Sequence, residues 1–197
     1  MRATPIQEED LCAPGRVNTK RGVTSLILGC MFSGKTTELI CRVERYLPDT
    51  LLAIKHVIDT RFGQDAIISH AEKWLAATPV SSAREILNLV DARTQVVAID
   101  ESHFFDLELV EVVAILNERG LDVVLTSLEP DSWSRPFPIN EMLRERAAEC
   151  VLKSAICAQC GGGADRTQRL TPVIGGNMVV DPSQYEPRCR ACWRAPK

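Results

Sequence analysis

The sequence lacks a long apolar run, an excess of positive charge and any internal repeat. Its 197 residues contain no hydrophobic stretch close to the roughly 20 residues that span a bilayer, so we expect no membrane partner. Residues 1–10 are polar and lack the hydrophobic core of a secretory signal, which favours a cytoplasmic protein. The net charge of −3 disfavours binding to duplex nucleic acid through a large basic surface.

The composition is that of a folded protein with a sizeable core. Apolar residues make up 45% of the chain and charged residues 25%, which leaves too little charge bias for disorder. The length predicts one globular domain, or one domain with a small appendage.

Short apolar runs alternate with segments of helical periodicity. Strands are predicted at residues 23–28, 51–54, 95–99 and 121–128, and helices at residues 34–46, 83–90 and 107–118. This alternation predicts an α/β fold with a mostly parallel sheet. After Pro138 a short helix and a strand near residues 150–156 lead into an end rich in Gly, Pro and Cys. We therefore predict a mobile leader (1–21), a core (22–155) and a C-terminal domain (156–197).

One segment fits the phosphate-binding pattern G-x-x-x-x-G-K-[ST] between a predicted strand and a predicted helix. It consists of Gly29, Cys30, Met31, Phe32, Ser33, Gly34, Lys35 and Thr36. In such a loop the backbone N–H groups and the helix N-terminus attract phosphate. Lys35 would neutralise the β- and γ-phosphates of ATP, and the Thr36 hydroxyl would ligate Mg²⁺. The alternative is an ordinary Gly-rich turn.

Acidic residues follow two of the predicted strands. Asp100 ends a run of four apolar residues, as does the acid that reaches Mg²⁺ in P-loop enzymes. Glu101 comes next and would accept a proton from water or a substrate hydroxyl, unless it is a solvated loop acid. Asp59 and Arg61 follow the strand at 51–54, where they would contact metal-bound water and phosphate or form a surface ion pair.

Four of the eight cysteines form two C-x-x-C pairs near the C-terminus. They are Cys157 with Cys160 and Cys189 with Cys192. Each pair presents two sulfurs to one point, so two pairs complete a tetrahedral thiolate site for a structural Zn²⁺. A redox pair is the alternative, although such pairs usually occur in a thioredoxin-like setting.

Together these motifs resemble the zinc-containing, P-loop (type II) thymidine kinases over residues 24–193. The resemblance is carried by Met31–Leu39, Asp59-Thr60-Arg61, Asp100-Glu101 with Phe104-Phe105, Arg135-Pro136-Phe137 and the two cysteine pairs. It implies a RecA-like P-loop core and a zinc-bearing lasso domain. It also implies transfer of the ATP γ-phosphate to the 5′-hydroxyl of thymidine, a step of deoxynucleoside salvage for DNA synthesis.

The resemblance also implies roles for individual residues. Glu101 matches the catalytic base, and His103, where the family often has Gln, stands with the ATP-binding residues. The residues matched to nucleoside binding are Met31, Phe104, Phe137, Thr167, Gly175, Gly176 and Tyr185. The family is usually tetrameric, so a homotetramer is expected.

Two segments depart from the family, and two other functions stay open. The segment Glu129–Trp133 differs and Asn177–Gln184 is an insertion, which permits a kinase for another nucleoside. The other alternative is a P-loop ATPase whose zinc ribbon binds single-stranded nucleic acid or a protein, with Glu101 activating water. It is supported by a basic cluster of Arg166, Arg169, Arg188, Arg190 and Arg194.

Overall fold

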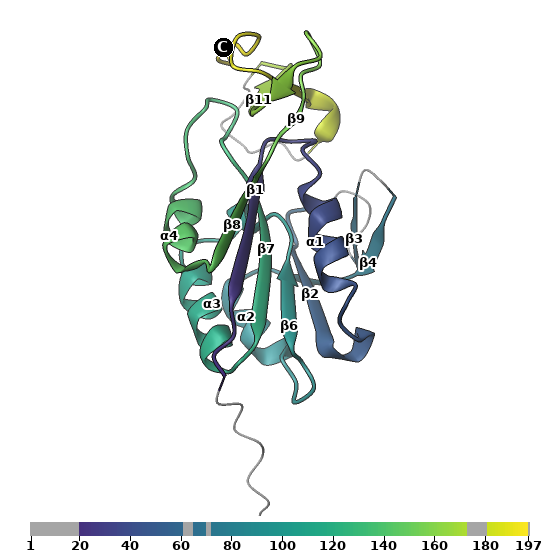
Figure 1. The fold of residues 1–197 in the computed structure, drawn as a ribbon, viewed down its shortest axis with the longest axis vertical. Coiled ribbons are helices and arrows are strands. Elements are labelled where there is room, and N and C mark those ends of the chain that lie inside the picture. Colours follow the sequence, from purple (N-terminus) through teal and green to yellow (C-terminus); the bar gives the residue numbers. More distant parts are fainter. Residues whose placement is uncertain (1–19, 61–64, 70–71, 173–180, 197) are drawn as a thin grey trace, which may run out of the picture.

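The fold is built on a six-stranded sheet, seen in a computed structural model that describes residues 20–60, 65–69, 72–172 and 181–196 (Figure 1). The strands pair in the order β5-β2-β6-β7-β1-β8, and every pairing is parallel. Their bounds are β1 (Thr24–Gly29), β2 (Leu51–His56), β5 (Thr78–Val80), β6 (Val96–Ile99), β7 (Asp122–Leu128) and β8 (Glu149–Lys153). The predicted α/β class with a parallel sheet is confirmed.

Helices cover both faces of the sheet. They are α1 (Lys35–Val43), α2 (Ala83–Leu89), α3 (Glu108–Glu118) and α4 (Pro138–Arg146). Alternate strand residues face opposite layers: Leu26 and Leu28 pack in the cluster that includes α2, α3 and α4, whereas Ile27 packs against α1. Both faces of the strands are therefore buried, which explains why they read as continuous apolar runs.

Short elements complete the core and were not predicted. The strands β3 (Ala66–Ile68) and β4 (Trp74–Ala76) form a hairpin beside α1, and 3₁₀ turns occupy Pro48–Thr50 (η2) and Ser102–Phe104 (η3). The helix predicted to reach residue 46 ends at Val43. Beyond it the Tyr46 N–H bonds to the Val43 carbonyl at 3.0 Å, a tighter turn than the α-helix, and the Tyr46 hydroxyl donates to Asp122 at 2.9 Å.

The C-terminal segment lies above the carboxyl ends of the sheet strands (Figure 1). Two small antiparallel pairs form it, β9 (Ala155–Ile156) with β10 (Gly163–Ala164) and β11 (Arg166–Arg169) with β12 (Tyr185–Arg188). A 3₁₀ turn, η4 (Pro182–Gln184), precedes β12. The division of the chain at residue 155 stays a prediction, and nearly all of the predicted leader lies outside the described residues.

In the part of the chain that the structure describes, no helix combines the length and apolar character needed to cross a membrane.

Candidate active site

The predicted phosphate and metal residues meet where β1, β2 and β6 end. There a cavity of about 300 Å³ is lined by residues from all three loops. The predicted residues among its lining are Met31, Phe32, Gly34, Lys35, Thr36, Asp59, Asp100 and Glu101. The carboxyl edge of a parallel sheet is where ligands bind in open α/β folds. The structure therefore brings both acidic motifs to the phosphate-binding loop.

The loop after β1 is curled by its glycines and by internal hydrogen bonds. Gly34 adopts the left-handed conformation (φ 79°), which favours glycine, and begins α1. A Cβ on Gly29 would lie 2.5 Å from the backbone oxygen of Lys153, so no larger residue fits there. Lys35 Nζ donates to the Cys30 carbonyl at 3.0 Å, and Ser33 Oγ donates to the same oxygen at 2.8 Å. Gly34, Lys35 and Thr36 all line the cavity, so the N-terminus of α1 and one ammonium group border it, as phosphate binding requires.

Cys30 is a residue of the phosphate-binding loop whose side chain packs into the protein interior. Its side chain is fully buried, and burial raises the pKa of its thiol. The Cys30 Sγ donates a weak hydrogen bond to the Ala164 carbonyl at 3.5 Å. Since Ala164 belongs to β10, this contact attaches the C-terminal segment to the phosphate-binding loop.

Thr36 and Asp100 converge on one point beside the cavity. Thr36 Oγ1 lies 3.3 Å from each carboxylate oxygen of Asp100 and donates to them. The hydroxyl of Thr126 also donates to Asp100, and the Glu101 N–H donates to Thr126 Oγ1 at 2.9 Å. Thr126 lies on β7, which separates β1 from β6. A hydroxyl and a carboxylate at one point are the oxygen ligands that Mg²⁺ prefers.

Glu101 has a strained backbone at the edge of the cavity. Its dihedral angles (φ 51°, ψ 50°) are left-handed, which costs a residue with a side chain roughly 1–2 kcal/mol. Glu101 Oε2 lies 3.5 Å from Nδ1 of His103, and that nitrogen accepts a hydrogen bond from the Leu128 N–H at 3.2 Å. Of the described cavity residues other than glycine, Phe32 and Glu101 have such a backbone, and of these two Glu101 carries a carboxylate, which makes it a candidate proton acceptor.

The residues matched to the nucleoside fall into two groups. The imidazole of His103 lies between the rings of Phe104 and Phe137, with centroid distances of 4.3 and 5.0 Å. In the second group, the Met31 N–H donates to Thr167 Oγ1 at 3.1 Å.

Tyr185 stands on β12, paired with Arg169 of β11, two register steps from Thr167. Arg61, Gly175 and Gly176 lie outside the described residues, as do residues 177–180 of the insertion Asn177–Gln184.

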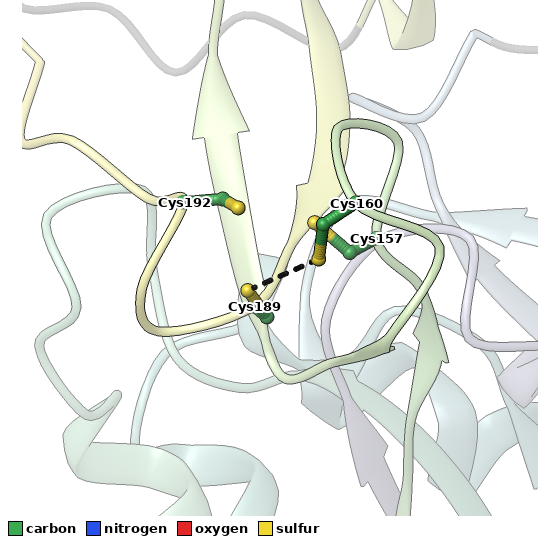
Figure 2. Close-up of side chains that lie close together, drawn as sticks. All are labelled: Cys157, Cys160, Cys189 and Cys192. Carbon is green, nitrogen blue, oxygen red and sulfur yellow. Dashed lines mark hydrogen bonds between the residues drawn. The ribbon is translucent and has the colours of Figure 1, made fainter.

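The four cysteines of the C-x-x-C pairs gather at one point in the C-terminal segment (Figure 2). All four sulfurs lie within 4.8 Å of one another, and Cys160 Sγ is 3.7 Å from Cys189 Sγ. Sulfurs around a tetrahedral zinc ion with Zn–S bonds of about 2.3 Å lie about 3.8 Å apart. A disulfide requires a sulfur–sulfur distance of about 2.05 Å. The four cysteines are thus free thiols, and the convergence of four sulfurs rather than two fits a tetrahedral thiolate metal site.

The pKa values of the thiols fit the same conclusion. Burial of Cys157 opposes ionisation, but N–H groups of Cys189, Cys160 and Gln159 donate to its sulfur and lower its pKa to about 6. Hydrogen bonding with Cys189 and burial raise the pKa of Cys192 to about 12. Four sulfurs this close do not all ionise without a compensating cation, which a metal ion would supply.

Three residues that sequence reasoning missed help to build the site. Thr126 links Asp100 to Glu101, and the Trp193 indole N–H donates to the Ser132 carbonyl at 3.3 Å, joining a cysteine knuckle to the core. Lys55 lines the cavity although it lies within an apolar strand. A lone lysine in an apolar strand is visible in the sequence as an unusual buried charge. Nothing in the sequence marks Thr126 or Trp193 in this way.

Comparison with known proteins agrees with this geometry. A family model described as thymidine kinase matches residues 22–193. The chain is 38% identical over 172 residues to a thymidine kinase of Bdellovibrio bacteriovorus, covering 86% of this chain and 84% of that protein. It is 40% identical over 180 residues to a thymidine kinase of a Rhodothermus species, covering 89% of this chain and 83% of that protein.

Proposed function

The chain belongs to the thymidine kinase family, and we propose that it transfers the γ-phosphoryl group of ATP to the 5′-hydroxyl of thymidine with Glu101 as the catalytic base. Membership of this family makes it an ATP-dependent kinase, a transferase, and favours the kinase over the ATPase with a zinc ribbon. The observation that carries the assignment of the site is the cavity shared by Lys35, Asp100 and Glu101.

The phosphate side of the site is assigned to the loop after β1. Lys35 and backbone N–H groups at the start of α1, residues 34–36, would hold the β- and γ-phosphates of ATP. Thr36 and Asp100 would hold Mg²⁺, with Asp59 close by, and the ion neutralises phosphate charge when it is bound. In a loose transition state most of the catalysis comes from positioning and electrostatics, which a fixed loop of this kind provides.

The proton side is assigned to Glu101. Its carboxylate would accept the proton of the 5′-hydroxyl as that oxygen attacks the γ-phosphorus, and it is held in place by its backbone bond to Thr126. Phe104, Phe137 and Tyr185 would pack against the nucleoside, and the lasso would cover it to exclude water and limit ATP hydrolysis. Zn²⁺ on the four clustered cysteines would hold the lasso in shape.

The remaining proposals concern assembly and location. The family resemblance favours a homotetramer. Eight cysteines, of which the described ones outside the metal site are free, favour a reducing compartment such as the cytoplasm.

The proposed reaction is tested with labelled ATP and a panel of nucleosides, scored for the monophosphates formed. We expect thymidine 5′-monophosphate to be the main product. Preferred phosphorylation of another nucleoside would support the alternative kinase that the changes in Glu129–Trp133 and the insertion permit. ATP hydrolysis without any nucleoside product would contradict the proposal.

Replacing Lys35 with Ala should weaken ATP binding and lower kcat together. The Lys35 ammonium faces the phosphates in both the ground state and the transition state, so its loss acts on both quantities. Binding of an ATP analogue and steady-state kinetics measure the two effects. The exposed Lys73, which pairs with Glu44 at 2.7 Å, offers a control through Lys73→Ala. Unchanged affinity and rate in Lys35→Ala would mean that the loop does not bind ATP.

A further inference from the structure

Lys55 is a buried charge that the proposed reaction has not yet used. It lies on β2 between Ile54 and His56, and only 2% of its surface is exposed. Burying an ammonium group costs free energy unless hydrogen bonds and opposite charges compensate for it. A lysine at this position therefore needs a compensating environment, and the site supplies one.

The contacts of Lys55 point toward the phosphate cavity. Its Nζ donates a hydrogen bond to the carbonyl of Ala66 at 3.1 Å, and Ala66 is the first residue of β3. β3 in turn forms one wall of the cavity through Ala66, Ile67 and Ile68. Lys55 thus connects the strand that carries it to the wall opposite the phosphate-binding loop.

The charges around the cavity give Lys55 a second role. Three carboxylates, of Asp59, Asp100 and Glu101, face the same space as the ammonium groups of Lys35 and Lys55. All three acids are at least nine-tenths buried, so solvent screens them poorly. A triphosphate entering this space meets acidic repulsion. With Lys55 removed, the fixed charge of these five groups becomes more negative by one unit.

We propose that Lys55 is a positioning residue of the phosphate side: it anchors the β3 wall and offsets the carboxylates, so that ATP and its metal ion can be held together. This inference rests on the proposed function, because it assumes that the cavity receives the phosphates of ATP. Lys55 is not assigned a contact with the reacting atoms. Its effect should fall on ATP more than on the nucleoside, because Met31 is the only described residue matched to the nucleoside that lines this cavity.

The test compares Lys55→Met with the wild-type chain. Methionine has a similar length and fills similar space, but it removes the charge of Lys55 and its hydrogen bond to the Ala66 carbonyl. We expect the affinity for a non-hydrolysable ATP analogue with Mg²⁺ to fall by about one to two orders of magnitude, because one positive charge is lost from a poorly screened site that binds a polyanion. Thymidine affinity, measured well below the variant's own thermal midpoint of unfolding, should stay close to that of the wild type.

Two further variants separate this role from a structural one. Lys73→Met removes an exposed lysine and changes net charge equally, so it should leave ATP affinity unchanged. Lys55→Arg keeps the charge and should restore a large part of the affinity. A wild-type affinity for the analogue in Lys55→Met would overturn the proposal, as would equal losses for both substrates or the same loss in Lys73→Met.

Measuring the binding of the analogue also separates a failure of the Lys55 proposal from a failure of the proposed reaction. Binding of the analogue is measured without phosphoryl transfer. If the wild-type chain bound the analogue but phosphorylated no nucleoside, the proposed reaction would fail, and the comparison of Lys55 variants would still decide the role of Lys55.

Discussion

The Glu101→Gln enzyme should bind ATP nearly as well as the wild-type chain and yet turn over about two to four orders of magnitude more slowly. The amide cannot accept the proton of the substrate hydroxyl, which is the step assigned to the carboxylate. Gln has nearly the shape of Glu and tolerates the left-handed backbone equally, so the bond from the residue 101 N–H to Thr126 should persist. The loss should therefore appear in kcat, measured with saturating ATP and thymidine.

A matched control for this substitution is Glu118→Gln. Glu118 is an exposed acid on α3 that pairs at 4.0 Å with Arg21, which precedes the amino end of β1, and it does not line the cavity. We expect its kcat to match the wild type. Near-normal turnover in Glu101→Gln would remove Glu101 from the mechanism, and a parallel loss of ATP affinity would mean that the carboxylate supports the phosphate site instead.

The features that the sequence predicted correctly depend on local patterns. The run before Gly29 is continuously apolar because β1 is buried on both faces, and the helix begins where Gly34 permits a left-handed turn. Asp100 directly follows β6, so its place at the sheet edge follows from the strand alone. The two C-x-x-C pairs were sufficient to predict a single cluster because one metal ion requires four ligands.

What was missed depends on how distant segments pack. The strands β3, β4 and β5 have three residues each, which is too short for a periodic pattern to be recognised. Thr126 acts on Asp100 and Glu101 only because β7 lies between β1 and β6, and strand order is not written in any one segment. The bond between Met31 and Thr167 joins residues 136 positions apart.

Replacing one zinc-site cysteine, as in Cys189→Ser, should abolish metal binding and weaken nucleoside binding far more than ATP binding. Serine is a poor ligand in place of a thiolate, and metal binding at such sites is worth on the order of 10 kcal/mol. No residue beyond Ala147 belongs to the two apolar clusters that hold the helices on the sheet, among the described residues. The sheet should therefore stay folded while β11 and β12 become mobile.

ATP binding should nevertheless be affected to a small, measurable degree. Thr167 Oγ1 accepts from the Met31 N–H, and the Ala164 carbonyl accepts from Cys30, so the segment contacts the phosphate-binding loop directly. Losing one net hydrogen bond of about 1 kcal/mol corresponds to about a fivefold change in affinity. Thr167→Val removes the first of these bonds with all four cysteines in place, and should reproduce that part of the ATP effect alone.

Elemental analysis for zinc and separate affinities for the two ligands measure these outcomes. Cys150→Ser is the matched control, because Cys150 is an exposed, free thiol on β8 outside the cysteine cluster. Active wild-type protein purified without zinc would remove the metal site. Equal losses of ATP and nucleoside affinity in Cys189→Ser would mean that the metal supports the whole site. A loss of affinity confined mainly to the nucleoside would assign nucleoside binding to the lasso, because the lasso depends on the metal for its shape.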